Sequence, residues 1–307
     1  MDCLGSALGI AVCAKAAGAR PYIVLEEINE TIEIVVQETR QDKNFSNCII
    51  TPEQAEKMIR PSTILVIVDT QRPATTCAPN LIPNVSKLVL VDHHRRSADY
   101  IDNSTLQLLE SRASSASELI TEVLQYFDDS IRIPAFICSA LLAGITLDTK
   151  HFAFNVGSRT FEAAGFLRKN GADIGTVKQM FRDDMVSYTA CADAVRNAEI
   201  LPGGIALSRC DQTGTASESE ILIAAKVADQ LINIRGIEAG FALGRDEDCI
   251  NVSGRSLGNI NVQLICERLG GGGHLTMSGA QLKMSPDEAY TLVKNTLVEY
   301  VKEMQTK

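Results

Sequence analysis

Three apolar runs in this sequence each stop at an acidic residue. They are TILVIV (63–68) before Asp69, KLVLV (87–91) before Asp92-His93-His94, and AGITL (143–147) before Asp148. The first two runs lack polar alternation, which is typical of strands covered on both faces in a parallel sheet. Because the carboxyl ends of parallel strands meet at one edge, the polar residues that follow them converge there. The pattern predicts an α/β fold with a parallel sheet and a cluster of acids and imidazoles at its rim.

The length and the change of pattern along the chain predict two domains. At 307 residues the chain exceeds the usual size of one domain and is long enough to bury two cores. Helical patterns continue from Ser158 to about Asn197, and the pattern changes around Pro202-Gly203-Gly204. We therefore expect a first domain over 1–185, a helical linker over 186–202 and a smaller α/β domain over 203–307.

Composition restricts the partners and the compartment. The formal net charge of −9, from 29 basic and 38 acidic residues, disfavours a long nucleic acid and favours a small anionic ligand. The nine cysteines are odd in number, scattered and never in C-x-x-C spacing, which predicts a reducing compartment with neither a disulfide framework nor a zinc site. The sequence has no run near the roughly 20 apolar residues of a membrane span and no signal peptide. We therefore expect a cytoplasmic chain.

Carboxylates and imidazoles that meet at one rim have the chemistry of a metal site. The acids and histidines that end the three runs supply mostly oxygen donors, which favour manganese or magnesium over metals that prefer thiolates. Asp2, at the start of the first predicted helix, can join them if it lies beside the same edge. A single acid after a strand more often caps the next helix or turn. Four acids that converge with a histidine pair predict a metal site instead.

Four motifs occur in the order and the strand context of one known family. They are Val68-Asp69-Thr70, Asp92-His93-His94, Leu147-Asp148-Thr149 and Gly270-Gly271-Gly272-Gly273-His274. With them, essentially the whole chain resembles the DHH/DHHA1 phosphoesterase superfamily. Two longer segments, 148–173 and 253–274, are most similar to the catalytic region of GdpP-type cyclic-di-AMP phosphodiesterases. The resemblance implies a parallel-sheet DHH domain followed by a smaller α/β DHHA1 domain.

By this resemblance, the first domain binds two manganese ions and carries the catalytic residues Asp92, His93 and His94. Asp69 bridges the two ions, and His94 contacts the phosphate. The further ligands that complete one of the two sites are Asp2, His93 and Asp148. The family's first motif is His-x-x-x-Asp-x-Asp, and Met1-Asp2 supplies only its last two positions. The other ligands and the first strand are expected upstream, so that one metal site is incomplete and the chain is a fragment or begins at an internal methionine.

The second domain is expected to bind the substrate. Consecutive glycines at 270–273 allow a close approach of the backbone to an anion, and successive N–H groups can form a nest around phosphate oxygens. The candidate residues of this domain are Gly271, Gly272, Gly273, His274 and Arg255, whose guanidinium group can form a bidentate contact with a phosphate. By the resemblance, this domain holds the nucleotide in a cleft that closes against the metal-binding domain. Aromatic residues are few, and their spacing indicates no stacking platform.

The resemblance implies a manganese-dependent phosphodiesterase that opens cyclic-di-AMP to the linear dinucleotide pApA with a metal-activated water. A nano-RNase or pAp phosphatase that acts on short oligonucleotides is the alternative within the superfamily. A nucleotide-binding module without catalysis is an alternative of a different class, because part of the first metal motif is absent. Full-length relatives of this type are membrane-anchored and act at the cytoplasmic face of the membrane. A homodimer is compatible with the resemblance.

Overall fold

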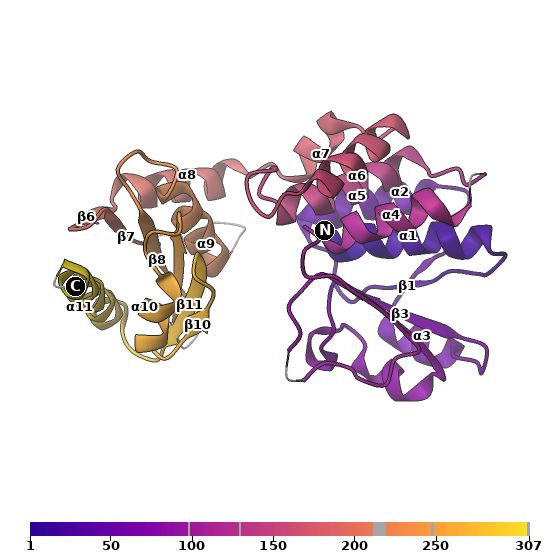
Figure 1. Ribbon diagram of the computed structural model, residues 1–307, viewed down its shortest axis with the longest axis horizontal. Coiled ribbons are helices and arrows are strands. Elements are labelled where there is room, and N and C mark those ends of the chain that lie inside the picture. The colour runs from indigo at the N-terminus through magenta and orange to yellow at the C-terminus, as the bar shows by residue number, and fades with distance from the viewer. Residues whose placement is uncertain (98, 129, 211–218, 247–248, 306–307) are drawn as a thin grey trace. The chain divides into compact units, whose positions relative to one another are not determined.

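The computed structural model describes residues 1–97, 99–128, 130–210, 219–246 and 249–305. The chain divides into two compact units, Met1–Arg182 and Asp183–Lys307. Each unit combines helices with strands (Figure 1), which confirms the predicted α/β class. Within the described ranges, no helix combines the length and the apolar character that crossing a membrane requires.

The first unit contains the predicted parallel strands. Its strands are β1 (Ile23–Val24), β2 (Ile49–Ile50), β3 (Ile64–Val68), β4 (Lys87–Asp92) and β5 (Leu106–Leu109). Its helices are α1 (Asp2–Ala16), α2 (Glu30–Gln41), α3 (Pro52–Met58), α4 (Ala116–Phe127), α5 (Ala135–Asp148), α6 (Ser158–Lys169) and α7 (Ile174–Met180), and two 3₁₀ turns (Pro73–Thr75 and Pro79–Asn84) lie between β3 and β4. Strands β3, β4 and β5 form a parallel sheet in that order, and β1 pairs with β2 in parallel. The apolar runs at 63–68 and 87–91 are β3 and β4, as predicted.

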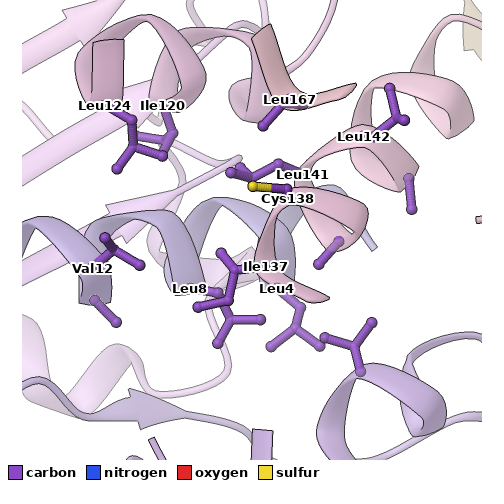
Figure 2. Close-up of a cluster of buried hydrophobic side chains, with 14 of the residues drawn as sticks. Leu4, Leu8, Val12, Ile120, Leu124, Ile137, Cys138, Leu141, Leu142 and Leu167 are labelled. Carbon is purple, nitrogen blue, oxygen red and sulfur yellow. The ribbon is translucent and has the colours of Figure 1, made fainter. Parts of the chain in front are cut away.

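Helix α1 packs closely against two other helices of the first unit because it carries glycines at the contact points. A Cβ atom at Gly5 would lie 2.7 Å from the carbonyl oxygen of Ala140 in α5, and one at Gly9 would lie 2.4 Å from the side chain of Ile120 in α4. Buried side chains of these helices fill the space between them (Figure 2), and they include Leu4, Leu8, Val12, Ile120, Leu124, Ile137 and Leu141. Each such side chain stabilises the fold by about 1.5–3 kcal/mol. The core therefore fixes the N-terminus of α1 against α4 and α5.

The second unit is built on one mixed sheet. Its strands are β6 (Glu199–Leu201), β7 (Ile205–Arg209), β8 (Ala239–Arg245), β9 (Ile250–Ser256), β10 (Gly272–Gly273) and β11 (Met277–Leu282), in the order β10-β11-β9-β8-β7-β6. Its helices are α8 (Met185–Arg196), α9 (Glu220–Leu231), α10 (Val262–Arg268) and α11 (Pro286–Gln305). Both faces of this sheet are covered by helices, and alternate residues of β7 point into two cores. Ile205 and Leu207 belong to the core with α10 and α11, whereas Ala206 belongs to the core with α8 and α9.

The segment 186–202 is not a linker in the structure. It contains most of α8 and all of β6, and both belong to the second unit. Cys191 and Ala194 of α8 are buried in the core that α8 shares with α9, and β6 pairs with β7 in antiparallel orientation. The division of the chain lies between Arg182 and Asp183. The physical reason is that the apolar face of α8 is covered by its own unit.

Candidate metal centre

Four side chains from distant parts of the sequence meet in the first unit. They are Asp2 in the first turn of α1, Asp69 directly after β3, His93 directly after β4, and Asp148 at the end of α5. One ligand atom from each side chain lies within 4.8 Å of the other three. Nε2 of His93 is 3.1 Å from Oδ2 of Asp148, 3.5 Å from Oδ1 of Asp69 and 4.0 Å from Oδ2 of Asp2. The structure thus brings these residues together, with Asp69 and His93 after strands and Asp148 at the end of a helix.

Asp2 is fixed by the first turn of α4. Its Oδ2 atom accepts the backbone N–H of Ala116 at 2.7 Å, and its Oδ1 atom accepts that of Ser117 at 2.8 Å. These N–H groups have no partner within the helix, and the helix dipole favours a negative charge beside them. Gly144 of α5 leaves room for this contact, since a Cβ atom there would lie 2.7 Å from Oδ1 of Asp2 and 2.3 Å from Oγ of Ser117. Asp2 therefore has a fixed position even when no cation is bound.

Asp69 has a left-handed backbone with φ of 63°, which is uncommon for residues other than glycine. Its backbone N–H donates to the carbonyl oxygen of Val91 at 2.9 Å, so the turn after β3 stays attached to β4. Sparsely populated backbone conformations persist only where the surrounding structure holds them, and they cluster at functional sites. The conformation of Asp69 is therefore consistent with a functional position.

Asp92 orients His94. Oδ1 of Asp92 lies 2.7 Å from Nδ1 of His94 and accepts the backbone N–H of His94 at 3.2 Å. Burial raises the pKa of Asp92, but these hydrogen bonds outweigh burial and hold it below its ordinary value. The hydrogen bond to Asp92 raises the pKa of His94, whose side chain is 57% exposed. A partly exposed imidazole with a raised pKa beside the cluster is suited to contact an anionic oxygen.

Gln71 holds the segment that carries the two histidines, and the sequence analysis does not include it. Its side chain is buried, and Nε2 donates to Oδ2 of Asp92 at 3.1 Å and to the carbonyl oxygens of His94 at 3.2 Å and Arg95 at 3.1 Å. Its backbone carbonyl oxygen accepts the N–H of Ile101 at 2.8 Å. The only sequence signal for this role is its position two residues after Asp69. Gln71 therefore connects the end of β3 to the Asp92-His93-His94 segment.

The donor set fits a divalent cation. Among the described residues, Oδ1 of Asp69 and Nε2 of His93 are buried and have no partner with hydrogen-bond geometry, although carboxylate oxygens lie close to Nε2. A buried polar atom without a partner destabilises a protein by about 1–3 kcal/mol. A cation between these atoms and the oxygens of Asp2 and Asp148 would satisfy both atoms and offset the carboxylate charges. Three carboxylates and one imidazole are ligands that suit manganese or magnesium.

The pKa values of the cluster reflect the same crowding of acids. Burial, with the charges of Asp69 and Asp148, raises the pKa of Asp2 to about 7. Burial lowers the pKa of His93, but the carboxylates of Asp148, Asp69 and Asp2 outweigh this effect and raise it to about 10. The metal-free cluster therefore retains protons near neutral pH. A cation that binds there must displace them.

The predicted substrate residues of the second unit already have partners within that unit. The N–H groups of Gly271 and His274 donate to the carbonyl oxygens of Cys266 at 2.8 Å and Met277 at 2.7 Å. A Cβ atom at Gly271 would lie 2.1 Å from the carbonyl oxygen of Gly279, and Gly273 has φ of 145°. These contacts differ from the expected phosphate nest, because the glycines allow the chain to turn from α10 into β10 against β11. Gly272 is different, since a Cβ atom there would have no neighbour within 4 Å.

Arg255 of β9 is mostly buried and forms an ion pair. Its Nε atom lies 3.1 Å from Oδ1 of Asp229 in α9, and its side chain is 12% exposed. Another guanidinium nitrogen donates to the carbonyl oxygen of Gly254 at 3.0 Å. Arg255 is therefore oriented by its ion pair with Asp229. A phosphate that binds Arg255 would share its guanidinium group with this carboxylate.

Comparisons with known proteins agree with the motifs along the chain. Residues 1–145 match the DHH family, N-terminal domain, and residues 217–303 match the DHHA1 domain. The chain is 36% identical over 304 residues to the cyclic-di-AMP phosphodiesterase GdpP of Bacillus subtilis (strain 168). It is 38% identical over 287 residues to the cyclic-di-AMP phosphodiesterase PdeA of Listeria monocytogenes serotype 1/2a (strain 10403S). The matches cover 98% and 92% of the chain but 46% and 43% of these relatives, so the chain spans less than half of their length.

One solved structure matches the whole chain. The crystal structure of an exopolyphosphatase-related protein from Bacteroides fragilis has a TM-score of 0.82 and is 16% identical to this chain. The match covers 100% of this chain and 90% of that one. At this level of identity the similarity shows a shared fold.

Proposed function

We propose, from the premise that this chain belongs to the DHH/DHHA1 phosphoesterase family, that it is a manganese-dependent phosphodiesterase that hydrolyses cyclic-di-AMP to pApA. Two relatives named as cyclic-di-AMP phosphodiesterases are 36% and 38% identical to it. The observation that carries the proposal is the cluster of Asp2, Asp69, His93 and Asp148, in which two buried ligand atoms have no hydrogen-bond partner among the described residues.

The residues of the cluster have distinct roles in this proposal. Asp2, His93 and Asp148 would hold one cation, and Asp69 would be shared with a second one. A bound divalent cation would lower the pKa of a water molecule and neutralise charge on the phosphoryl group. His94, which Asp92 orients and which is partly exposed, would donate a hydrogen bond to a phosphate oxygen of the substrate. Gln71 would keep His94 in place through its three hydrogen bonds.

The second unit would bind the nucleotide in this proposal. Gly273 and His274 are exposed there, Gly272 is half-buried with room beside its Cα atom, and Arg255 would contribute positive charge together with its partner Asp229. The resemblance also supports the proposals that the chain forms a homodimer and that its full-length relatives act at the cytoplasmic face of the membrane.

Turnover of cyclic-di-AMP in the presence of Mn²⁺, followed by anion-exchange chromatography, tests the proposal. We expect pApA as the product and loss of turnover in His93→Ala and Asp148→Asn. Asp102→Asn is the matched control, because Asp102 is exposed and lies outside the cluster. Undiminished turnover in both cluster variants contradicts the proposal.

The same assay distinguishes the other activities of the superfamily. Cyclic-di-AMP, pApA and pAp are compared at one Mn²⁺ concentration. Faster turnover of pApA or pAp than of cyclic-di-AMP would indicate a short-oligonucleotide or pAp hydrolase. Binding of cyclic-di-AMP in calorimetry without turnover of any of the three would indicate a nucleotide-binding module.

A further inference from the structure

The segment that follows Asp148 has an unusual backbone. Within the described ranges, the non-glycine residues with positive φ are Asp69, Lys150, His151, Phe152 and Asn155. Four of these five therefore lie within seven residues after a candidate metal ligand, and the fifth is itself one. Three consecutive left-handed residues are rare in L-amino-acid chains, and such conformations are retained where the structure needs a specific placement of side chains.

Thr149 fixes this segment. Its buried hydroxyl group donates to the carbonyl oxygen of Ile145 at 2.6 Å and accepts the N–H of Phe152 at 3.0 Å. Its carbonyl oxygen accepts the N–H groups of Ala153 at 2.8 Å and Phe154 at 2.9 Å. The chain therefore curls back on the end of α5, and the position of Phe152 is determined relative to Asp148.

Phe152 supports a second, exposed aromatic ring. Its half-buried ring packs on the core and stacks on Phe161 of α6, with centroids 5.7 Å apart and an angle of 18° between the rings. Phe161 is nevertheless 60% exposed. Phe154 and Leu147, from the same part of the chain, are also exposed. The pair thus places an aromatic ring that is more than half exposed, Phe161, on a partner ring that is anchored in the core.

A second connection joins this pair to the metal centre. Oγ1 of Thr160, the residue before Phe161, donates to Oε2 of Glu118 at 2.7 Å. Glu118 follows Ser117, whose backbone N–H holds Asp2. The aromatic pair is therefore attached to one candidate ligand through the loop after Asp148 and to another through the first turn of α4.

We propose that Phe161, supported by Phe152, is a stacking platform for an adenine base of the cyclic dinucleotide. This inference rests on the proposed function, because it assigns the base of that substrate. An exposed aromatic ring that two short connections attach to a phosphodiester site has the chemistry that binds a nucleobase face. The sequence gives no such indication, since residues 152 and 161 are brought together only by the left-handed turn.

The test compares a substrate that has bases with one that has none. We use Phe161→Ala, Phe161→Trp, which retains an aromatic face, and Phe127→Ala as the matched control, since Phe127 is exposed at the opposite end of α4 from Asp2. The dissociation constant of cyclic-di-AMP is measured by calorimetry with the full chain. Hydrolysis of cyclic-di-AMP and of bis(p-nitrophenyl) phosphate is measured with Mn²⁺.

We expect Phe161→Ala to weaken binding of cyclic-di-AMP about tenfold, whereas Phe161→Trp and Phe127→Ala stay within about twofold of the parent. Hydrolysis of bis(p-nitrophenyl) phosphate, which has no purine base, should fall less in Phe161→Ala than hydrolysis of cyclic-di-AMP. Unchanged affinity for cyclic-di-AMP, or equal losses on the two substrates, overturns the platform. A parent chain that binds cyclic-di-AMP without hydrolysing it contradicts the proposed function alone, because the loss of affinity in Phe161→Ala still supports the platform. A parent chain that neither binds nor hydrolyses cyclic-di-AMP overturns both the proposed function and the platform.

Discussion

The acidic cluster of the first unit and the glycine turn of the second unit were both predicted as ligand sites, but they differ in how their polar atoms are satisfied. In the cluster, Oδ1 of Asp69 and Nε2 of His93 are buried and have no hydrogen-bond partner among the described residues. In the turn, the N–H groups of Gly271 and His274 donate to carbonyl oxygens of the same unit. Unsatisfied buried groups need an external partner, whereas satisfied ones do not. The first region therefore depends on a ligand more strongly than the second.

Replacing the shared carboxylate of the cluster should have the largest effect. Asp69→Asn retains a side chain that tolerates the left-handed backbone. We expect turnover of cyclic-di-AMP to fall by about a thousandfold or more, because the amide is a poor ligand for the cation. We expect Mn²⁺ to stabilise the variant less than it stabilises the parent, since the cation loses one charged ligand. Thermal melts with and without Mn²⁺ measure this, and equal stabilisation of parent and variant by Mn²⁺ would contradict it.

A methyl group at Gly144 should disturb the cluster through packing. A Cβ atom there would lie within 2.7 Å of Oδ1 of Asp2 and closer to Oγ of Ser117. We expect Gly144→Ala to lower the free energy of unfolding by about 1–3 kcal/mol and to weaken Mn²⁺ binding. The matched control is Gly165→Ala in α6, where a Cβ atom has no neighbour within 4 Å. This control should raise stability by about 0.5–1 kcal/mol, since alanine favours the helix. If chemical denaturation gives Gly144→Ala the same free energy of unfolding as the parent, α1 and α5 can move apart at no cost in stability, which contradicts this prediction.

Gln71 tests whether the histidine segment needs support. Gln71→Leu removes three hydrogen bonds and leaves the carboxylate of Asp92 with fewer donors. We expect kcat to fall about tenfold while KM for cyclic-di-AMP changes less, because His94 would lose its fixed position. Gln107→Leu is the control, since Gln107 is exposed and, among the described residues, its side chain bonds only to Ser104. A change in KM with kcat retained would place Gln71 in substrate binding instead.

The pH dependence also tests whether the cluster depends on a cation, because the metal-free cluster holds protons where a cation would bind. Burial and its neighbouring acids raise the pKa of Asp2 from 3.8 to about 7, and the acids raise that of His93 from 6.5 to about 10 against the effect of burial. The folded state retains both protons over ranges in which the unfolded chain loses them, so metal-free stability should fall as pH rises through both ranges. Affinity for Mn²⁺ should rise, by about tenfold per pH unit for each displaced proton. Melts and calorimetry from pH 5.5 to 8.5 measure both trends, and stability that rises with pH would contradict the assignment.

The sequence predicts the cluster better than the features that support it. Asp69 and His93 follow apolar runs, and this local signal is sufficient because parallel strands bring their ends together. Asp2 was placed by family resemblance, since the first turn of α4 that holds it begins more than 100 residues later. The helix α8 was assigned to a linker because its sequence continues the preceding helical pattern and does not indicate which unit covers it. Gln71 and the Phe152–Phe161 pair depend on hydrogen bonds and turns that no periodic pattern encodes.

The smallest expected effect on stability is at Gly272, and it distinguishes two roles of the glycine turn: binding a phosphate and packing β10 on β11. At Gly272 a Cβ atom meets nothing within 4 Å and φ is not positive, so Gly272→Ala should change the free energy of unfolding by less than about 0.5 kcal/mol. If the backbone of Gly272 approaches a phosphate, the added methyl group should nevertheless weaken binding of cyclic-di-AMP in calorimetry. Gly271→Ala provides the contrast, since its Cβ atom would overlap the carbonyl oxygen of Gly279 and should destabilise the unit. Unchanged affinity in Gly272→Ala would mean that the glycines serve only the packing of β10 on β11, and that the first unit carries the site by itself.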